Sequence, residues 1–172
     1  MMRAILAMAV LPVALPAQTM EARMQDLAML YTAANPADCL SRAADPSTAA
    51  SCIGAASGTC MEQETDGYTT VGMMICAMVE TAAWDDLLNA EYQKTRARAA
   101  AMDGFESQPE YAVRADRLLD AQRAWITFRD AECALAYSEF GAGTMRVLAS
   151  SGCRLEMTAD RTIQLKFMFG EM

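Results

Sequence analysis

The stretch AQRAWITFRDAEC, residues Ala121–Cys133, decides how the rest of the chain is interpreted. Neither Gly nor Pro interrupts it, and apolar residues recur at steps of three and four, a spacing that predicts an α-helix. On a helical wheel, Gln122 and Arg129 fall in the middle of the apolar face, beside Trp125 and Ile126. Because an isolated buried guanidinium is costly, Arg129 must either reach solvent or meet a carboxylate.

Two further segments have helical faces of the same mixed character. One lies in Glu80–Tyr92 and carries Asp85, and the other contains Thr158 and Arg161. If the three faces meet, they form one polar seam in which Asp85 neutralises Arg129 or Arg161. Removing Arg129 would then cost roughly 3–5 kcal/mol if its ion pair is buried.

The seam has two interpretations. Polar networks that fix helix packing are common in protein cores, and this structural interpretation is the more frequent one. The alternative is a pocket for a ligand or a protein partner, and the surface to test lies around Trp125, Arg129 and Asp130. The candidate residues in either case are Asp85, Asn89, Tyr92, Gln122, Trp125, Arg129, Asp130, Thr158 and Arg161.

Turn signals divide the remaining chain into helices, and no segment of useful length alternates with a period of two. The expected helices are one opening at Pro36 and carrying Cys39, one from Pro46 through Cys52 to about Gly58, one over about 71–102, one from a capping box at Ser107 and Glu110 to Gly141, and one over about 144–169. The fold is therefore predicted to be all-α, a small disulfide-tied helical array with a C-terminal three-helix unit.

The first residues, MMRAILAMAVLPVALPAQ, are typical of a secretory signal peptide cleaved after Ala17. Their apolar run is shorter than the roughly 20 residues that a membrane span needs, and no Cys at the cleavage point invites a lipid anchor. We therefore expect a periplasmic or secreted protein without a membrane span after cleavage. Its expected parts are a signal peptide at 1–17, a helical N-terminal extension at 18–59 and a helical domain at 60–172.

Composition excludes several functions. The net charge of −8 disfavours nucleic-acid binding and favours basic partners. The chain has no His, so the commonest catalytic base and metal ligand are missing. Asp85, Asp86 and Glu91 offer carboxylates for glycosidase chemistry, but acidic helix faces are common, and no Ser has nucleophile-elbow spacing. We expect no enzymatic activity, no cofactor and no metal site.

The six Cys are an even number in a chain expected to be exported, which predicts three disulfides. No two Cys have C-x-x-C spacing, so a zinc or redox motif is not indicated. Cys133 and Cys153 lie almost symmetrically about the turn at Gly141–Gly143, and antiparallel helices would bring them together. An exchange of partners stays open for the other four, whose preferred pairs are Cys39–Cys52 and Cys60–Cys76.

Methionine supports a different interpretation of the function. The chain has 15 Met, and Met20/Met24 and Met74/Met78 have the i, i+4 spacing of thioether pairs that hold Cu(I). Methionine also packs helix cores well, and neither His nor a free Cys joins these pairs. A periplasmic Met-rich copper-binding protein is therefore kept as an alternative, together with a purely structural envelope protein.

The spaced motifs together resemble the lysozyme-inhibitor LprI-like (N-terminal domain) family. The resemblance covers about Cys60–Phe167, with GAGTM at a turn where the family often has two adjacent glycines. Its residues are AQRAWITFRDAEC, the Gly-containing turn, Cys153, Thr158, Arg161 and Leu165, and upstream Cys76, Leu88, Asn89 and Tyr92.

The resemblance implies that residues 60–172 form an LprI-like domain of an exported helical protein. The activity that gives the family its name implies a protein partner, a basic lysozyme or another cell-wall-active enzyme. The acidic charge is compatible with such a partner, and equally with ordinary solubility.

Overall fold

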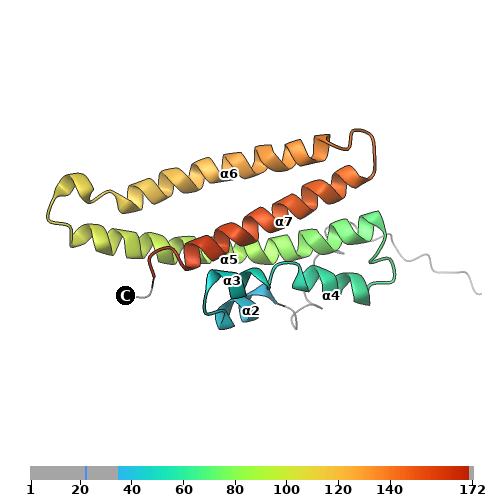
Figure 1. The fold of residues 1–172 in the computed structure, drawn as a ribbon, viewed down its shortest axis with the longest axis horizontal. Helices are drawn as coiled ribbons and strands as arrows, with labels where there is room; N and C mark the ends of the chain where they lie inside the picture. Colours follow the sequence, from blue (N-terminus) through green and yellow to red (C-terminus); the bar gives the residue numbers. More distant parts are fainter. Residues whose placement is uncertain (1–21, 23–34, 171–172) are drawn as a thin grey trace, which may run out of the picture.

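A computed structural model describes residue 22 and residues 35–170, and all regular structure in these residues is helical (Figure 1). The all-α prediction is confirmed. The expected signal peptide lies outside the described residues. The elements are α2 (Pro36–Arg42), α3 (Pro46–Ala50), α4 (Ala55–Gln63), α5 (Thr70–Gly104), the 3-10 helix η2 (Pro109–Tyr111), α6 (Arg114–Ser138) and α7 (Met145–Lys166).

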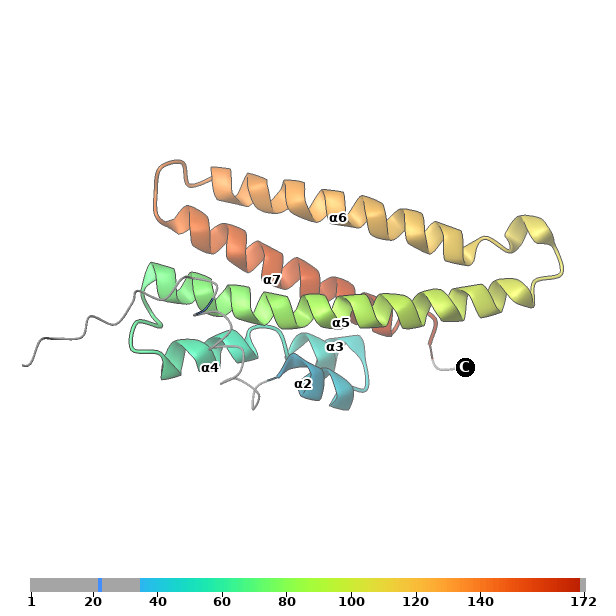
Figure 2. The same cartoon turned by 180° about the vertical axis from the view of Figure 1, so that it is seen from behind.

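Helix α5 is the longest element, with 35 residues, and the other helices are arranged along it. In both Figure 1 and the reverse view of Figure 2, α7 lies between α5 and α6, and α2, α3 and α4 lie on the other side of α5 from α6. The three long helices form the expected C-terminal three-helix unit. Helix α6 is its most exposed member, since only Leu118, Gln122 and Cys133 of its side chains are buried.

Apolar residues from non-adjacent helices join these layers. Trp84 is fully buried on α5 and packs in a cluster with Leu40 of α2, Ala49 of α3 and Leu155 of α7. A second cluster joins α5, α6 and α7 through Leu88, Leu118 and Leu165. Ile126, which the wheel places beside Trp125, is instead exposed, because α6 buries a narrower face than its apolar pattern suggests.

A buried carboxylate on α5 holds the start of α4. The Glu80 side chain is only 1% exposed, and its two oxygens accept hydrogen bonds from the backbone N–H groups of Gly54 at 2.8 Å and Ser57 at 2.7 Å. The Trp84 indole also donates to Glu80, at 2.9 Å. A negative charge is favourable at a helix N-terminus, where N–H groups lack intrahelical partners. Glu80 therefore fixes α4 against the turn of α5 that carries Trp84.

The expected single helix from Pro46 to about Gly58 is wrong: it is two helices, α3 and α4. Gly54 separates them with a φ of 85°, a left-handed conformation that glycine adopts without strain. Cys52 consequently lies in the connection between helices. The break directs the N–H groups of α4 toward Glu80.

The expected capping box at Ser107 and Glu110 is also wrong. The chain forms η2 there, and α6 begins later, at Arg114, with no cap from the side chain of Val113. The cap comes from Asp103, at the end of α5, whose carboxylate accepts from the N–H groups of Arg114 at 3.0 Å and Ala115 at 2.9 Å. The Arg114 guanidinium closes the connection by pairing with Asp103 at 3.1 Å and Glu106 at 3.2 Å.

All six Cys are in disulfides, which confirms the three predicted pairs. They are Cys39–Cys52, Cys60–Cys76 and Cys133–Cys153, with Cα–Cα distances of 5.8, 5.6 and 5.5 Å. Cys60–Cys76 joins α4 to α5, and Cys133–Cys153 joins α6 to α7.

Glu80→Gln should lower the free energy of unfolding by about 2 kcal/mol, because an amide has one acceptor oxygen and places donors against the donors of α4. Chemical denaturation monitored by circular dichroism measures this change. The matched control is Glu62→Gln, an exposed position on α4, with an expected change within about 0.5 kcal/mol. Equal effects of the two substitutions would show that Glu80 does not hold α4.

The Asp103 cap should be sensitive to acid. Desolvation raises the pKa of its carboxyl, but the hydrogen bonds from Ala115 and Arg114 outweigh it and hold this pKa below the ordinary value of 3.8. A group whose pKa is lower in the folded state stabilises the protein above its unfolded pKa, and this contribution is lost as the pH falls through the folded pKa. The thermal midpoint of Asp103→Asn should therefore lie below that of the wild type at neutral pH, and the two should converge below pH 3.8. A difference that is constant with pH would contradict the proposed cap.

Candidate functional site

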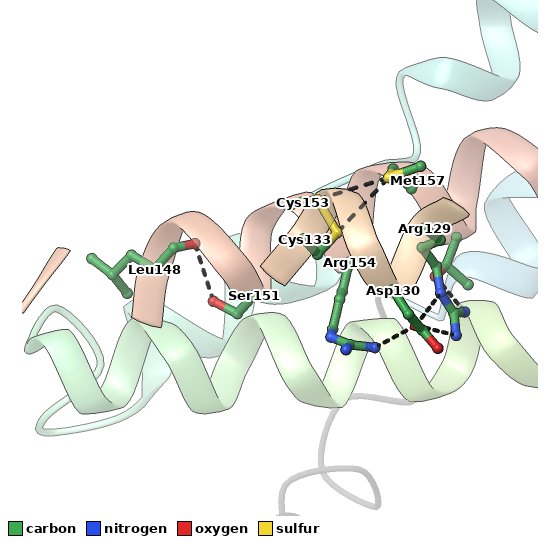
Figure 3. Close-up of a disulfide and its surroundings, with 9 residues drawn as sticks. Arg129, Asp130, Cys133, Leu148, Ser151, Cys153, Arg154 and Met157 are labelled. Atoms are coloured by element: carbon green, nitrogen blue, oxygen red, sulfur yellow. Dashed lines mark hydrogen bonds and ion pairs between the residues drawn. A yellow bond between two sulfur atoms is a disulfide. The ribbon is translucent and has the colours of Figure 1, made fainter. Parts of the chain in front are cut away.

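Four charged side chains form a network where α5, α6 and α7 meet. Arg129 of α6 pairs with Asp85 of α5 at 3.6 Å and with Asp130 at 3.1 Å. Asp130 also accepts from Arg154 of α7 at 3.1 Å, and Arg129 donates to the Thr158 hydroxyl at 3.4 Å. We call the four charged residues, Asp85, Arg129, Asp130 and Arg154, the Arg129 network. Figure 3 shows Arg129 and Arg154 converging on Asp130, near the Cys133–Cys153 disulfide.

The network is only partly withdrawn from water. The Arg129 side chain is 15% exposed, whereas Asp85 and Asp130 are 51% and 48% exposed. An exposed carboxylate that loses its partner is rehydrated at little cost. The seam thus pairs Asp85 with Arg129, but in a half-exposed ion pair instead of a buried one.

An open groove of about 520 Å³ lies beside the network, between the N-terminal half of α5, the C-terminal half of α6 and the N-terminal half of α7. Asp85, Arg129 and Arg154 contribute its charged groups. We call it the Met78 groove, since its apolar walls include Met74, Met78, Tyr137 and Val147. The predicted thioether pair Met74/Met78 therefore lies in this groove, whereas Met20 and Met24 lie outside the described residues.

The second arginine of the seam, Arg161, has a different environment. Its Nε donates to the Gln122 side chain at 2.9 Å and its Nη1 to the Gln164 side chain at 2.6 Å. Its Nη2 is buried and has no hydrogen-bond partner among the described residues. Burial lowers the pKa of the Arg161 guanidinium below its usual range. Trp125 lies next to both arginines, with its ring centroid 5.1 Å from Arg129 Cζ and 5.9 Å from Arg161 Cζ.

The other two candidate residues lie apart from these polar contacts. Tyr92 packs against the cluster of Leu88 and Leu165, and its buried hydroxyl has no hydrogen-bond partner in the described part of the chain. Asn89 is exposed. The sequence-derived seam is therefore two separate networks, one around Arg129 and one around Arg161, with Trp125 between them.

Arg154 and Gln164 belong to these networks but are absent from the sequence-based candidates. Arg154 precedes Thr158 by four residues and Arg161 by seven, so helical spacing already places it on the same face of α7. Gln164 follows Arg161 by three residues, within reach of its side chain. Both residues could have been found by extending the α7 face in each direction.

Within the described part of the chain, no three side chains of His, Cys, Asp or Glu are arranged to hold a metal ion. In the Arg129 network, each carboxylate is paired with at least one arginine.

Comparison with protein-family models identifies one family. The family model described as "Lysozyme inhibitor LprI" matches residues 60–165. An uncharacterised protein of Rhizobium meliloti (strain 1021) is 35% identical over 130 residues, which cover 73% of this chain and 94% of that protein. No solved structure matches the chain.

Arg129→Leu should lower the free energy of unfolding by about 1–2 kcal/mol, less than a buried pair would lose, because its half-exposed carboxylate partners regain water. Urea denaturation at low and high salt measures this change, which should shrink as salt screens the ion pairs. Arg123→Leu, on an exposed position of α6, is the control. A loss above about 3 kcal/mol that does not depend on salt would show a buried pair.

Proposed function

The chain belongs to the family of the lysozyme inhibitor LprI, and on this premise we propose that it is an exported protein-binding domain that inhibits lysozyme or another cell-wall-active enzyme. The family match carries the proposal, since it covers α5, α6 and α7 almost completely. The family description names an inhibitor, which is consistent with a protein that binds an enzyme and catalyses nothing itself.

We place the enzyme-binding surface at the Met78 groove and the Arg129 network. Protein interfaces are enriched in arginine, methionine and tyrosine at their centres, and the groove offers Arg129, Met78 and Tyr137 together. Asp85 and Asp130 remain half exposed beside it, available to cations of a partner. The net charge of −8 would also speed association with a basic lysozyme.

Three disulfides support export to an oxidising compartment, the periplasm or the medium. None of the described helices is both long and apolar enough to cross a membrane.

Titration of the purified protein with a basic lysozyme at physiological salt tests the proposal, with binding measured by calorimetry and enzyme activity by lysis of cell-wall substrate. We expect binding at micromolar concentration or below and a matching loss of lysis. Binding without any loss of lysis, or no binding at micromolar concentration, would reject lysozyme inhibition.

Two variants test the position of the surface. Met78→Ala and Tyr137→Ala remove side chains from the groove walls and should each weaken binding about tenfold if they lie at the centre of the interface. The control is Phe105→Ser, because Phe105 is 91% exposed at the opposite, α5–α6 end of the molecule. If only the control weakens binding, the inhibitory function stands but the interface lies at that end.

A further inference from the structure

Arg161 is a buried cation that has no anionic partner among residues 22 and 35–170. The residue is only 8% exposed, yet both groups bonded to its guanidinium are neutral amides, Gln122 and Gln164. Among the described residues, no carboxylate lies within ion-pair distance of it. Amide oxygens orient a guanidinium but do not neutralise it, and a buried charge ordinarily requires a counter-charge. The folded protein therefore retains a capacity for one anion at this point.

A second groove adjoins Arg161. It has a volume of about 720 Å³, lies between α3, α6 and α7, and is separate from the Met78 groove, with which it shares no residue. We call it the Phe167 groove. Its walls are mainly apolar and include Pro46, Trp125, Met157, Ile163, Phe167 and Met168. Grooves of this size with few polar groups are typical of sites for small molecules.

The two amides on Arg161 differ in their relation to this groove. Gln122 is buried in the packing between α6 and α7 and does not line the groove. Gln164 is exposed and lines it, and its side-chain oxygen accepts the bond from Nη1 at 2.6 Å. Gln164 is thus the group that an entering ligand would replace, because an exposed side chain can rotate into solvent while Gln122 keeps the guanidinium oriented.

We propose that the Phe167 groove binds a small carboxylate with an apolar body: the carboxylate replaces the Gln164 amide on Arg161, and the apolar body packs against Trp125 and Phe167. A carboxylate matches the two-pronged geometry of a guanidinium, and such charge-assisted hydrogen bonds are about twice as strong as neutral ones. The inference goes beyond the proposed inhibition of an enzyme and does not depend on it.

The other charges at the groove are consistent with a single carboxylate. Asp160 is the one acidic residue in its lining; it is exposed and forms no ion pair with Arg161. Water screens its charge in part, so it weakens the binding of an anion without preventing it. Lys166 lies beside the groove, with its Nζ 5.6 Å from the ring centroid of Phe167, and adds positive charge there. A cationic ligand would be repelled by both Arg161 and Lys166.

Calorimetric titration with octanoate tests the proposal, with octanol and octylammonium as ligands of the same length that lack the carboxylate. The wild type should bind octanoate about tenfold more tightly than octanol, and octylammonium more weakly than either. In an NMR spectrum of the labelled protein, the Nε–H resonance of Arg161 should shift with octanoate and much less with octanol.

Substitutions assign the preference to Arg161. Arg161→Gln should bind octanoate and octanol equally, whereas Arg123→Gln, the same change on an exposed position of α6 outside the groove, should keep the wild-type preference. Two surface variants should strengthen octanoate binding about threefold: Asp160→Asn removes a like charge, and Gln164→Ala removes the competing amide. These two variants keep the test valid if Arg161→Gln does not fold.

The proposal is wrong if the wild type binds octanoate and octanol equally, or binds neither at millimolar concentration. It is also wrong if Arg161→Gln keeps the preference, or if Asp160→Asn and Gln164→Ala leave octanoate binding unchanged. None of these results bears on lysozyme inhibition, which is assigned to the Met78 groove.

Discussion

The carboxylate of Glu80 is the constraint on which the arrangement of the molecule depends. A buried charge is tolerated only when its hydrogen bonds are complete, and here the partners come from the start of α4 and from Trp84. Trp84 in turn packs against α2, α3 and α7. One turn of α5 therefore sets the position of the N-terminal helices and of α7 together. Thr81 and Asp85, which directly follow Glu80 and Trp84 in α5, line the Met78 groove, so the same contacts fix this wall of the groove.

The two arginines of the seam show how burial changes the role of the same side chain. Arg129 lies near solvent among carboxylates, and its charge is neutralised by Asp85 and Asp130. Arg161 lies among amides, and no described carboxylate balances its charge. Trp125 separates them and contributes a face to each. A single stretch of α6 thus supports two chemically distinct surfaces.

Local rules predicted the helical fold and the disulfide pairs, because helical periodicity and hairpin symmetry act over short distances. They failed where the deciding partner is distant in sequence. Asp103 caps α6 from the preceding helix, and Glu80 holds α4 from the following one. Charge balance predicted that Asp85 pairs with an arginine of the seam, and the partner is Arg129. It did not predict that Arg161 meets amides instead of a carboxylate. That outcome depends on how α7 packs between α5 and α6. The sequence also did not predict which apolar side chains are exposed. Ile126 belongs to the apolar face of the helical wheel, but α6 does not bury it.

Each disulfide joins consecutive cysteines of the chain, the first to the second, the third to the fourth and the fifth to the sixth, over separations of 13, 16 and 20 residues. Every bond can therefore close as soon as its second cysteine enters an oxidising compartment, before later cysteines are available as wrong partners. If the chain is exported N-terminus first, order of arrival would favour the native pairing among the possible connectivities. A chain oxidised all at once from the reduced, unfolded state loses this advantage and must find the same pairing by exchange.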